Sequence, residues 1–394
     1  MTPSARLQAA IELVEAIAAA AREGGAAADT LIRDYFKQRR YAGSGDRRAV
    51  RDLVYRAIRR SGERPASGRA ALLGLAEQDE DLRALFDGSP HGPAAIEAGE
   101  SGAGAAVVPA WLLPRLDPLI SQDEIPSLLD RAPLDLRVNR LKGDREAAAA
   151  LLPEAHPTPF SPLGLRLPEG SQVENSEAWR SGLVEVQDEG SQLVALACGA
   201  TPGQDVIDLC AGAGGKTLAL AAEMGDRGRI IASDTDRGRL SRLAPRLARA
   251  GVTNVEQRLL NPRAELDALA DWRGMADAVL VDAPCSGSGT WRRNPETRWR
   301  LDPQRLARLV EIQAYLLDVA AELVRPGGTI TYAVCSLLAE EGREQALGFQ
   351  ARRSSFVSEA TAIDCGRSCG PGRLLTPGHD GTDGFFVARW RAPC

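Results

Sequence analysis

The chain has 394 residues, of which 44% are hydrophobic and 26% are charged, and its formal net charge is −5. This length exceeds what one hydrophobic core usually supports, so we expect two or three domains. The acidic total excludes uniform affinity for nucleic acids, although basic charge can be concentrated locally, and the lack of a run of about 18 apolar residues excludes an ordinary membrane-spanning helix.

The N-terminus and the cysteines indicate a cytoplasmic enzyme. Glu12 and Glu15 interrupt what would have to be the apolar centre of a signal peptide. Seven cysteines, an odd number over a long chain, do not fit the pattern of a small disulfide-bonded domain, and we expect them to be reduced. Cys365 and Cys369 form one isolated pair in a chain with three histidines, so no metal site is expected.

The first half of the chain predicts two small modules. Residues 1–108 predict a helical module and a linker, because apolar residues recur at helical spacing up to Arg60 and glycine and proline accumulate after it. Residues 109–187 predict a small α+β module. It begins with a strand over Leu134–Val138 and continues with an alanine-rich helix and short strands broken by proline.

From residue 188 to 394 the pattern changes to apolar strands separated by helical stretches. This pattern is typical of a doubly wound α/β domain, a Rossmann-like parallel sheet covered by helices. Ligands of such sheets bind at the carboxyl ends of the strands. The longest amphipathic helix is predicted over Leu306–Val324, and the strands over Val206–Cys210, Ile230–Asp234, Val255–Leu259, Ala278–Ala283, Thr329–Ser336 and Phe385–Arg391.

The first of these strands runs into a glycine-rich turn, Cys210–Lys216, that leads into a helix. Such a turn lets a ligand approach bare backbone at a helix N-terminus. The Gly-Lys-Thr sequence suggests a phosphate-binding P-loop, but that motif needs a glycine where this chain has Cys210. Asp234 ends the second strand, where an acid can accept hydrogen bonds from ribose hydroxyls. The alternative is that Asp234 caps the following helix.

Two cysteines lie at the ends of neighbouring strands. Cys285 follows Asp282 at the end of the fourth strand, and Cys335 ends the fifth, so both side chains should converge on one crevice. A buried cysteine is usually only a small hydrophobic residue. Two of them beside a predicted nucleoside pocket favour a chemical role instead.

Taken together, these residues resemble the Sun/Nop2 family of RNA cytosine carbon-5 methyltransferases, and most closely its bacterial RsmB-like ribosomal RNA enzymes. The resemblance covers nearly the whole chain. Tyr41–Arg60 is similar to the NusB-like, RNA-binding helical domain of that group. Gln187–Gln192, the glycine-rich turn, the Asp-Ala-Pro-Cys-Ser-Gly segment at Asp282–Gly287 and the Arg-Arg-Asn-Pro segment at Arg292–Pro295 follow in the family's order.

The resemblance implies S-adenosylmethionine as the cofactor and a cytosine in RNA, expected in the small ribosomal subunit, as the substrate. Asp234 would hold the cofactor's ribose, and Asp282 would lie at both the cofactor and the target base. Cys335 matches the nucleophile that attacks carbon 6 of the base, and Cys285 matches the second cysteine, which helps to release the product. The cofactor would be wrapped by Cys210, Ala211, Gly212, Ala213, Gly214, Gly215 and Lys216.

Two stretches concentrate basic and aromatic residues. Between Arg33 and Arg60 there are ten basic residues against three acidic ones, and a solvated helix face is the alternative to RNA binding there. The second stretch, Arg292–Arg308, directly follows the segment that contains Cys285. We expect it to contact the RNA strand that flanks the target base. The candidate contacts are Arg292, Arg293, Trp291 and Arg298.

The sequence departs from the family's pattern at three places. Gly212 and Ala213 stand where the family usually has Ala-Pro, Val334 stands where threonine is common, and Asn261 stands where an acidic residue would face the adenine. Asn261 leaves open the alternative of a catalytically impaired RNA-binding relative, although Lys216 and the other reactive residues are present. A transfer RNA substrate is a further alternative. We expect a monomer.

Overall fold

The structure is a computed structural model that describes residues 1–168 and 170–394, and these form two compact units. The helical unit contains Met1–Leu116, Gln122–Asp130 and Ser286–Pro303. The α/β unit contains the rest, Asp117–Ser121, Arg131–Cys285 and Gln304–Cys394. Chain order alone would place 286–303 in the domain from 188 to 394, whereas in space these residues belong to the helical unit.

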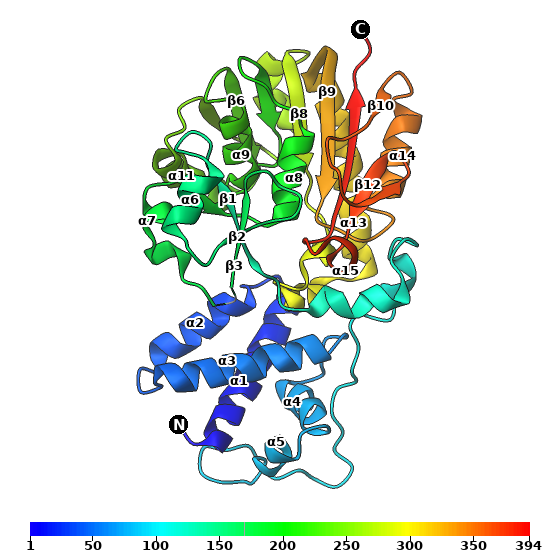
Figure 1. The fold of residues 1–394 in the computed structure, drawn as a ribbon. Helices are drawn as coiled ribbons and strands as arrows, with labels where there is room; N and C mark the ends of the chain where they lie inside the picture. Colours follow the sequence, from blue (N-terminus) through cyan, green and yellow to red (C-terminus); the bar gives the residue numbers. More distant parts are fainter. Residues whose placement is uncertain (169) are drawn as a thin grey trace. The chain divides into compact units, whose positions relative to one another are not determined.

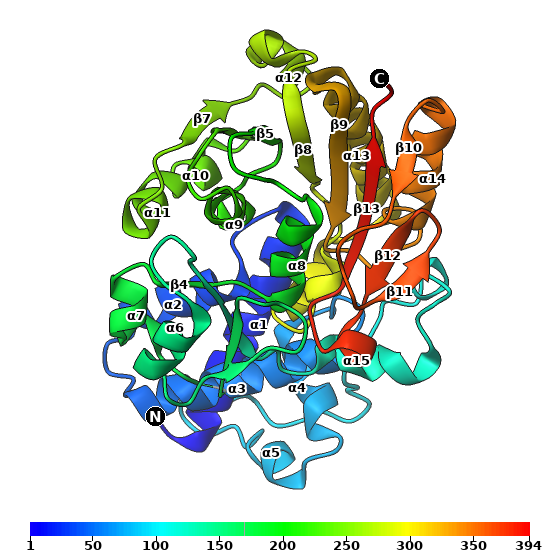
Figure 2. The same ribbon diagram turned by 45° about the horizontal axis from the view of Figure 1, so that its top comes forward.

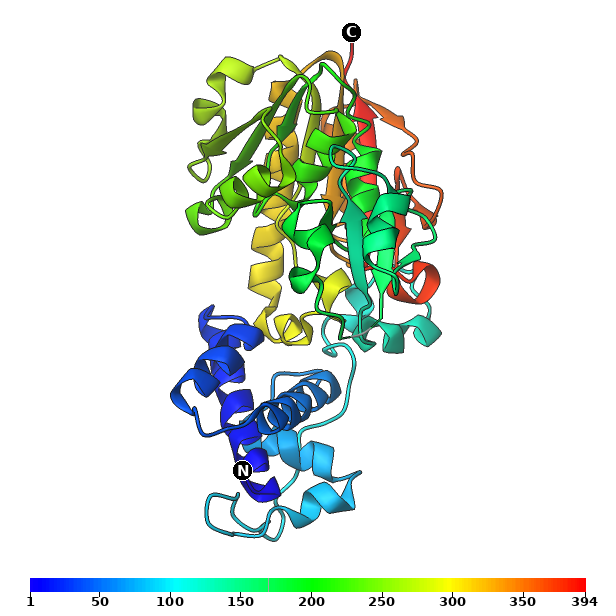
Figure 3. The ribbon, with the colours of Figure 1, turned by 60° about the vertical axis from the view of Figure 1, so that its left-hand side comes forward.

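Helix α1 is the centre of the helical unit and lies against α3 and α4; the blue helices in Figure 3 show this arrangement. Thr2 caps its start by accepting a hydrogen bond from Ala5 N, and Gly24 ends it in the left-handed conformation with φ +74°. One apolar face of α1, with Leu13 and Ile17, is buried in the core of the unit. The helices are α1 (Pro3–Glu23), α2 (Ala28–Gln38), α3 (Ser44–Arg60), α4 (Gly68–Ala76) and α5 (Glu80–Ala84), with short 3₁₀ turns at Leu113–Arg115, Gln122–Leu129, Ser288–Thr290 and Pro295–Arg300.

A small antiparallel sheet with strand order β2-β3-β1-β4 begins the α/β unit. Strand β1 has the predicted bounds, Leu134–Val138. The other strands are β2 (His156–Pro157), β3 (Gly164–Leu167) and β4 (Val184–Val186), accompanied by α6 (Arg145–Leu151), a 3₁₀ turn at Val173–Asn175 and α7 (Glu177–Arg180). Its own hydrophobic cluster includes Leu136, Val138, Leu165 and Val184.

The large sheet of the described residues has nine strands in the order β11-β12-β13-β9-β8-β5-β6-β7, with β10 also paired to β13. Strands β7, β6, β5, β8 and β9 are parallel, and β13 joins β9 antiparallel. Figure 2 labels β7, β5, β8, β9 and β13 in this order across the sheet. The strands are β5 (Asp205–Asp208), β6 (Arg229–Asp234), β7 (Val255–Leu259), β8 (Ala276–Asp282), β9 (Val324–Val334), β10 (Val357–Glu359), β11 (Arg367–Cys369), β12 (Gly372–Leu375) and β13 (Phe385–Arg391).

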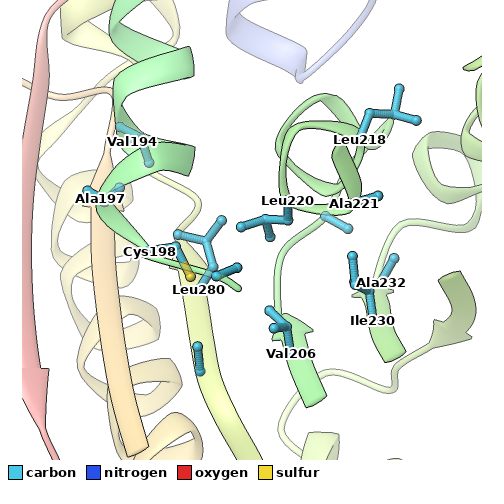
Figure 4. Close-up of a cluster of buried hydrophobic side chains, with 14 of the residues drawn as sticks. Val194, Ala197, Cys198, Val206, Leu218, Leu220, Ala221, Ile230, Ala232 and Leu280 are labelled. Carbon is cyan, nitrogen blue, oxygen red and sulfur yellow. The ribbon is translucent and has the colours of Figure 1, made fainter. Parts of the chain in front are cut away.

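Helices cover both faces of this sheet, α8 and α9 on one and α13 on the other (Figure 1). Leu220 and Ala221 of α9 pack over Val206 and Ile230 of the central strands (Figure 4). The strand residues in this core alternate along each strand, as expected when both faces are covered. The helices are α8 (Glu189–Ala197), α9 (Gly215–Glu223), α10 (Arg237–Leu240), α11 (Leu243–Ala250), α12 (Glu265–Ala268), α13 (Pro303–Leu323), α14 (Arg343–Arg352) and α15 (Pro377–Asp380), with a 3₁₀ turn at Ala270–Trp272.

The Rossmann-like α/β fold expected from the sequence is confirmed. Because β6 and β7 extend the sheet on one side of β5 while β8 returns on the other, the strand order reverses between β5 and β8. Doubly wound sheets bind ligands at the carboxyl ends of strands beside such a reversal. No helix in the described part of the chain is long and apolar enough to cross a membrane.

Candidate active site

The glycine-rich turn between β5 and α9 requires glycine for steric reasons. Gly212 and Gly214 have φ values of +56° and +84°. A Cβ on Gly214 would lie 2.0 Å from Leu243 Cδ1, so a larger residue would have to displace this leucine as well as adopt a left-handed backbone. Gly214 is also the N-cap of α9 and has no side chain to occupy the first amide groups of the helix. The turn thus presents bare backbone at a helix N-terminus, as the sequence predicted.

An arginine on α11 donates a hydrogen bond to the backbone of this turn. Arg246 Nη1 donates to the carbonyl oxygen of Ala213 over 2.7 Å, and its Nη2 donates to Glu185 Oε2 over 3.0 Å. Glu185 is buried in β4 and is also bound by Arg249. The small sheet and the glycine-rich turn are therefore connected through a paired carboxylate.

Asp234, at the end of β6, faces the same turn. Its Oδ2 accepts a hydrogen bond from Gly212 N over 2.8 Å, and its Oδ1 accepts one from Asp236 N over 2.7 Å. The N-cap of α10 is Asp236, whose side chain accepts from Arg239 N. Asp234 is thus not the cap of this helix, and each of its oxygens has a lone pair left for a further donor.

Asp208, at the end of β5, is a buried acid that sequence reasoning did not single out. Thr217 Oγ1 donates to its Oδ2 over 2.7 Å, while Oδ1 has no hydrogen-bond partner. Burial, followed by the charges of Asp282 and Asp234, raises the pKa of Asp208 to about 7. In the sequence, only the position of Asp208 shortly before the glycine-rich turn indicated a role for it.

Lys216 connects the glycine-rich turn by an ion pair to the end of β8, the fourth of the predicted strands. Its Nζ lies 2.8 Å from Asp282 Oδ2 at the end of β8 and 5.2 Å from the centre of the Phe385 ring. Burial disfavours the ammonium charge, but the Asp282 carboxylate outweighs burial, and the pKa of Lys216 is raised. Lys216 is consequently a fixed cation in the site.

The two predicted cysteines meet at the ends of β8 and β9. The sulfur atoms of Cys285 and Cys335 are 3.4 Å apart, and both side chains are partly exposed. Cys335 is also close enough to Lys216 to raise the pKa of the lysine. Cys210, in the turn, is different, since burial and the carboxylates of Asp234, Asp208 and Asp282 raise the pKa of its thiol well above the usual value.

A buried hydrogen-bond network holds the segments that carry these cysteines, and no sequence motif marks it. Gln313 of α13 donates from Nε2 to the Pro284 carbonyl over 2.9 Å and to Glu341 Oε1 over 3.0 Å. Glu341 Oε2 accepts from Ser336 Oγ over 2.5 Å. Because Pro284 precedes Cys285 and Ser336 follows Cys335, one network fixes both segments.

Asn261 lies just beyond β7, on the side of the sheet where Asp234 ends β6. Leu260 N donates to the Asp234 carbonyl over 2.9 Å. The exposed Asn261 follows Leu260 and is therefore close to the end of β6. Its backbone carbonyl accepts from Ala264 N. The side chain remains a candidate cofactor contact.

The arginine-rich segment after Cys285 has a structural role that contradicts part of the RNA-contact prediction. Arg298 is 1% exposed, and its guanidinium donates to the carbonyls of Ile58, Arg59, Ser61 and Val107. The first three of these carbonyls end helix α3, so Arg298 is a C-terminal cap. Burial lowers the pKa of Arg298 to about 9, which still leaves it charged at pH 7.

Neighbouring residues of the 3₁₀ turn at Pro295–Arg300 bind other helix ends. Arg300 donates to the carbonyls of Gly25 and Ala26 just after α1, while Glu296 accepts from Ala28 N at the start of α2. Cations at helix C-termini and an anion at an N-terminus match the helix dipoles. Trp291 is 0% exposed, and Arg292 is buried. We therefore withdraw Arg298 and Trp291 as RNA contacts. The half-buried Arg293 and the buried Arg292 remain predictions.

The isolated cysteine pair lies at β11. Cys365 and Cys369 are buried, and Cys369 Sγ donates to Asp117 Oδ2 over 3.3 Å. Among the described residues, no group of three or more histidine, cysteine, aspartate or glutamate side chains is placed to hold a metal ion.

Comparison with known proteins identifies relatives of this chain. Residues 195–391 match the family described as 16S rRNA methyltransferase RsmB/F. Ribosomal RNA small subunit methyltransferase B of Salmonella typhi is 35% identical over 291 residues, which are 71% of this chain and 65% of that protein. The corresponding protein of Salmonella newport is 34% identical over the same shares. The chain thus spans just under two thirds of the length of these curated relatives.

Two solved structures share the fold. The crystal structure of PH0851 has a TM-score of 0.79 and 23% sequence identity, and the match covers 99% of both chains. NSun6 from Pyrococcus horikoshii has a TM-score of 0.60 and 20% identity and covers 67% of this chain and 92% of its own. The match to a methyltransferase family confirms the expected cofactor, S-adenosylmethionine. The chain belongs to the RsmB/F family of 16S rRNA methyltransferases.

Proposed function

We propose that this chain transfers a methyl group from S-adenosylmethionine to carbon 5 of a cytosine in small-subunit ribosomal RNA. The observation that carries the proposal is the pair of sulfur atoms, Cys285 and Cys335, 3.4 Å apart at the ends of adjacent strands. The Lys216–Asp282 ion pair lies beside them. The family's description supports ribosomal RNA as the substrate class.

The residues at the glycine-rich turn fit the cofactor. The amide groups at the start of α9, which no N-cap side chain occupies, suit a carboxylate. Asp234 can accept a hydrogen bond from a ribose hydroxyl, and Asn261 can accept one from an adenine amino group. When bound, S-adenosylmethionine supplies an electrophilic methyl group.

Cys335 is the proposed nucleophile. Carbon 5 of cytosine is a poor nucleophile by itself, so the Cys335 thiolate first forms a bond to carbon 6, which turns the ring into an enamine. Asp282 holds the Lys216 ammonium by a hydrogen-bonded ion pair, and the positive charge of that ammonium stabilises the ring nitrogen that gains electron density. Carbon 5 can then take the methyl group.

Cys285 is the proposed residue for product release. After methyl transfer, carbon 5 still carries its proton, which must leave before the bond between Cys335 Sγ and carbon 6 can break. The Cys285 sulfur is close enough to Cys335 to act at the same ring. It assists removal of the proton, the electron pair re-forms the ring double bond, and Cys335 leaves as the thiolate.

Methyl transfer from labelled S-adenosylmethionine to RNA tests the function. Small-subunit ribosomal RNA and transfer RNA from cells that lack the endogenous activity serve as separate substrates, and bisulfite mapping locates the product. We expect one cytosine of ribosomal RNA to be labelled by the wild type and none by Cys335→Ala. A Cys198→Ala variant is the matched control, since Cys198 is fully buried in the core.

The other outcomes decide between the alternatives. Label in transfer RNA alone would replace the substrate and keep the chemistry. A wild-type chain that binds RNA but neither retains the cofactor nor transfers a methyl group would contradict the proposed function. In that case Asn261 would identify a chain that has the fold of the family but not its activity.

A further inference from the structure

Gln187 lies between β4 and α8, beside the start of helix α9. A Cβ placed on Gly215, the first residue of α9, would lie 3.9 Å from Gln187 Nε2. We propose that Gln187 binds the carboxylate of S-adenosylmethionine through Nε2, and that Arg137 is a positioning residue that fixes the orientation of the Gln187 amide. This inference deepens the proposed function, since it rests on a cofactor carboxylate at the start of α9.

The surroundings of Gln187 leave it little freedom to move. Its backbone N–H donates to the Asp135 carbonyl over 3.0 Å, and its backbone carbonyl accepts from Gln192 Nε2 over 2.9 Å. The residue is 7% exposed, whereas Gly215 opposite its amide is partly exposed. A side chain that is already ordered loses little conformational entropy when a ligand binds to it.

Arg137 on β1 decides which end of the Gln187 amide faces α9. Arg137 Nε donates to Gln187 Oε1 over 2.7 Å. Because a guanidinium offers only donors, the amide oxygen must face it and the amide nitrogen must face Gly215. Ser191 Oγ accepts one hydrogen of Nε2 over 3.3 Å, and no other acceptor for Nε2 lies among the described residues. The second N–H suits the cofactor's carboxylate, whereas the cofactor's ammonium group offers only donors and does not fit.

Positive charge exceeds negative charge around Arg137. Arg137 faces Glu185 in the register of β1 and β4, and Glu185 is already bound by Arg246 and Arg249. Burial lowers the pKa of Arg137 to about 10, so its side chain is charged at pH 7. Glu223 also attracts this charge, but it has a separate arginine partner. Three cations thus share Glu185, and because Arg246 also contacts the glycine-rich turn, their excess charge favours an anionic group there.

Two ligands that differ in the carboxylate test the contact. S-adenosylmethionine and its decarboxylated form share the adenosine, sulfonium and amino groups, so the ratio of their affinities in isothermal titration reports on the carboxylate. Gln187→Ala removes the donor, and Gln187→Glu keeps the size of the side chain but places an acceptor against the carboxylate. Ser191→Ala is the matched control, because Ser191 accepts from the same Nε2. Melting temperatures verify that each variant is folded.

We expect Gln187→Ala to lower the affinity ratio about tenfold, because a hydrogen bond to a charged group is lost. Gln187→Glu should lower the ratio further through repulsion, and Ser191→Ala should leave it unchanged. An unchanged ratio in Gln187→Ala, or an equal fall in Ser191→Ala, would overturn the contact while cofactor binding itself stands. A wild-type chain that binds neither ligand would instead contradict the proposed function.

Arg137→Met tests the positioning role. It should lower the affinity ratio as well, and the double variant Arg137→Met/Gln187→Ala should have the same ratio as Gln187→Ala, because Arg137 acts through Gln187. Arg137→Lys, which keeps a charged donor for Oε1, should restore most of the ratio. Losses that multiply in the double variant, or no rescue by Arg137→Lys, would overturn the positioning role of Arg137.

Discussion

Replacement of Arg246 by alanine removes the hydrogen bond that holds the glycine-rich turn at Ala213. Glu185 would not be left as an unpaired buried carboxylate, because Arg249 still binds it. A hydrogen bond from a charged donor contributes about 1.5–3 kcal/mol. If roughly half of this is used to order the turn for its ligand, S-adenosylmethionine binding should weaken by about 0.7–1.5 kcal/mol, which corresponds to about three- to twelvefold.

A second substitution separates the role of the turn from general stability. Proline is usual at position 213 in the family that the sequence resembles, and Ala213 N–H donates no hydrogen bond among the described residues. Proline restricts the free turn, an effect of about 0.4–1 kcal/mol. Ala213→Pro should therefore restore much of the affinity in the Arg246→Ala variant and change the wild type little.

Isothermal titration of S-adenosylmethionine measures all four proteins of this double-mutant cycle. Arg249→Ala is the matched control, since Arg249 binds the same Glu185 and the Trp179 carbonyl but not the turn. Equal cofactor affinity in Arg246→Ala and the wild type would refute the reasoning. Equal weakening by Arg249→Ala would also refute it, because the loss would then come from the small sheet.

Three further predictions concern the buried polar groups. The pKa of Asp208 is about 7 in the folded chain, against a usual value of 3.8. Asp208 therefore contributes stability that is present below about pH 4 and lost as the pH rises through 7. The melting temperature of the wild type should thus fall relative to that of Asp208→Asn between about pH 5 and 8, whereas parallel curves would contradict the pKa shift. Gln313→Ala should lower the methyl-transfer rate about tenfold and leave the S-adenosylmethionine affinity unchanged, because it releases the segments of both cysteines. An unchanged single-turnover rate would show that the network does not position the cysteines. Arg298→Ala should destabilise the chain by about 3 kcal/mol in chemical denaturation, since charged hydrogen bonds to the end of α3 are lost. As a control, Arg308→Ala on the exposed face of α13 should change the stability little. Equal effects of the two substitutions would contradict the capping role of Arg298.

The sequence was sufficient for those parts of the site that are local in the chain. The glycine-rich turn, Asp234, Asp282 and the two cysteines each follow a strand, and a parallel sheet brings such residues to one edge whatever the details of packing. Strands β7 and β13 have the predicted bounds. Strand β9 ends at Val334, before the predicted Ser336, which places Cys335 just beyond the strand.

The parts that could not be predicted depend on contacts between distant segments. Arg298 binds Ile58 across 240 positions of sequence, and a charge pattern does not distinguish such a helix cap from an RNA contact. The network of Gln313 and Glu341 has no signature, because an isolated glutamine on an amphipathic helix looks solvent-exposed. The short strands β10, β11 and β12 were also missed, since segments of three or four residues carry too little alternation.

Covalent trapping of RNA tests the assignment of the two cysteines most directly. Wild type, Cys285→Ala, Cys335→Ala and the double variant are incubated with small-subunit ribosomal RNA and S-adenosylmethionine and separated under denaturing conditions. If Cys335 attacks carbon 6 and Cys285 assists release, only Cys285→Ala should accumulate a protein–RNA adduct, and the double variant should form none. An adduct that persists in the double variant, or methyl transfer by Cys335→Ala, would contradict the proposed mechanism.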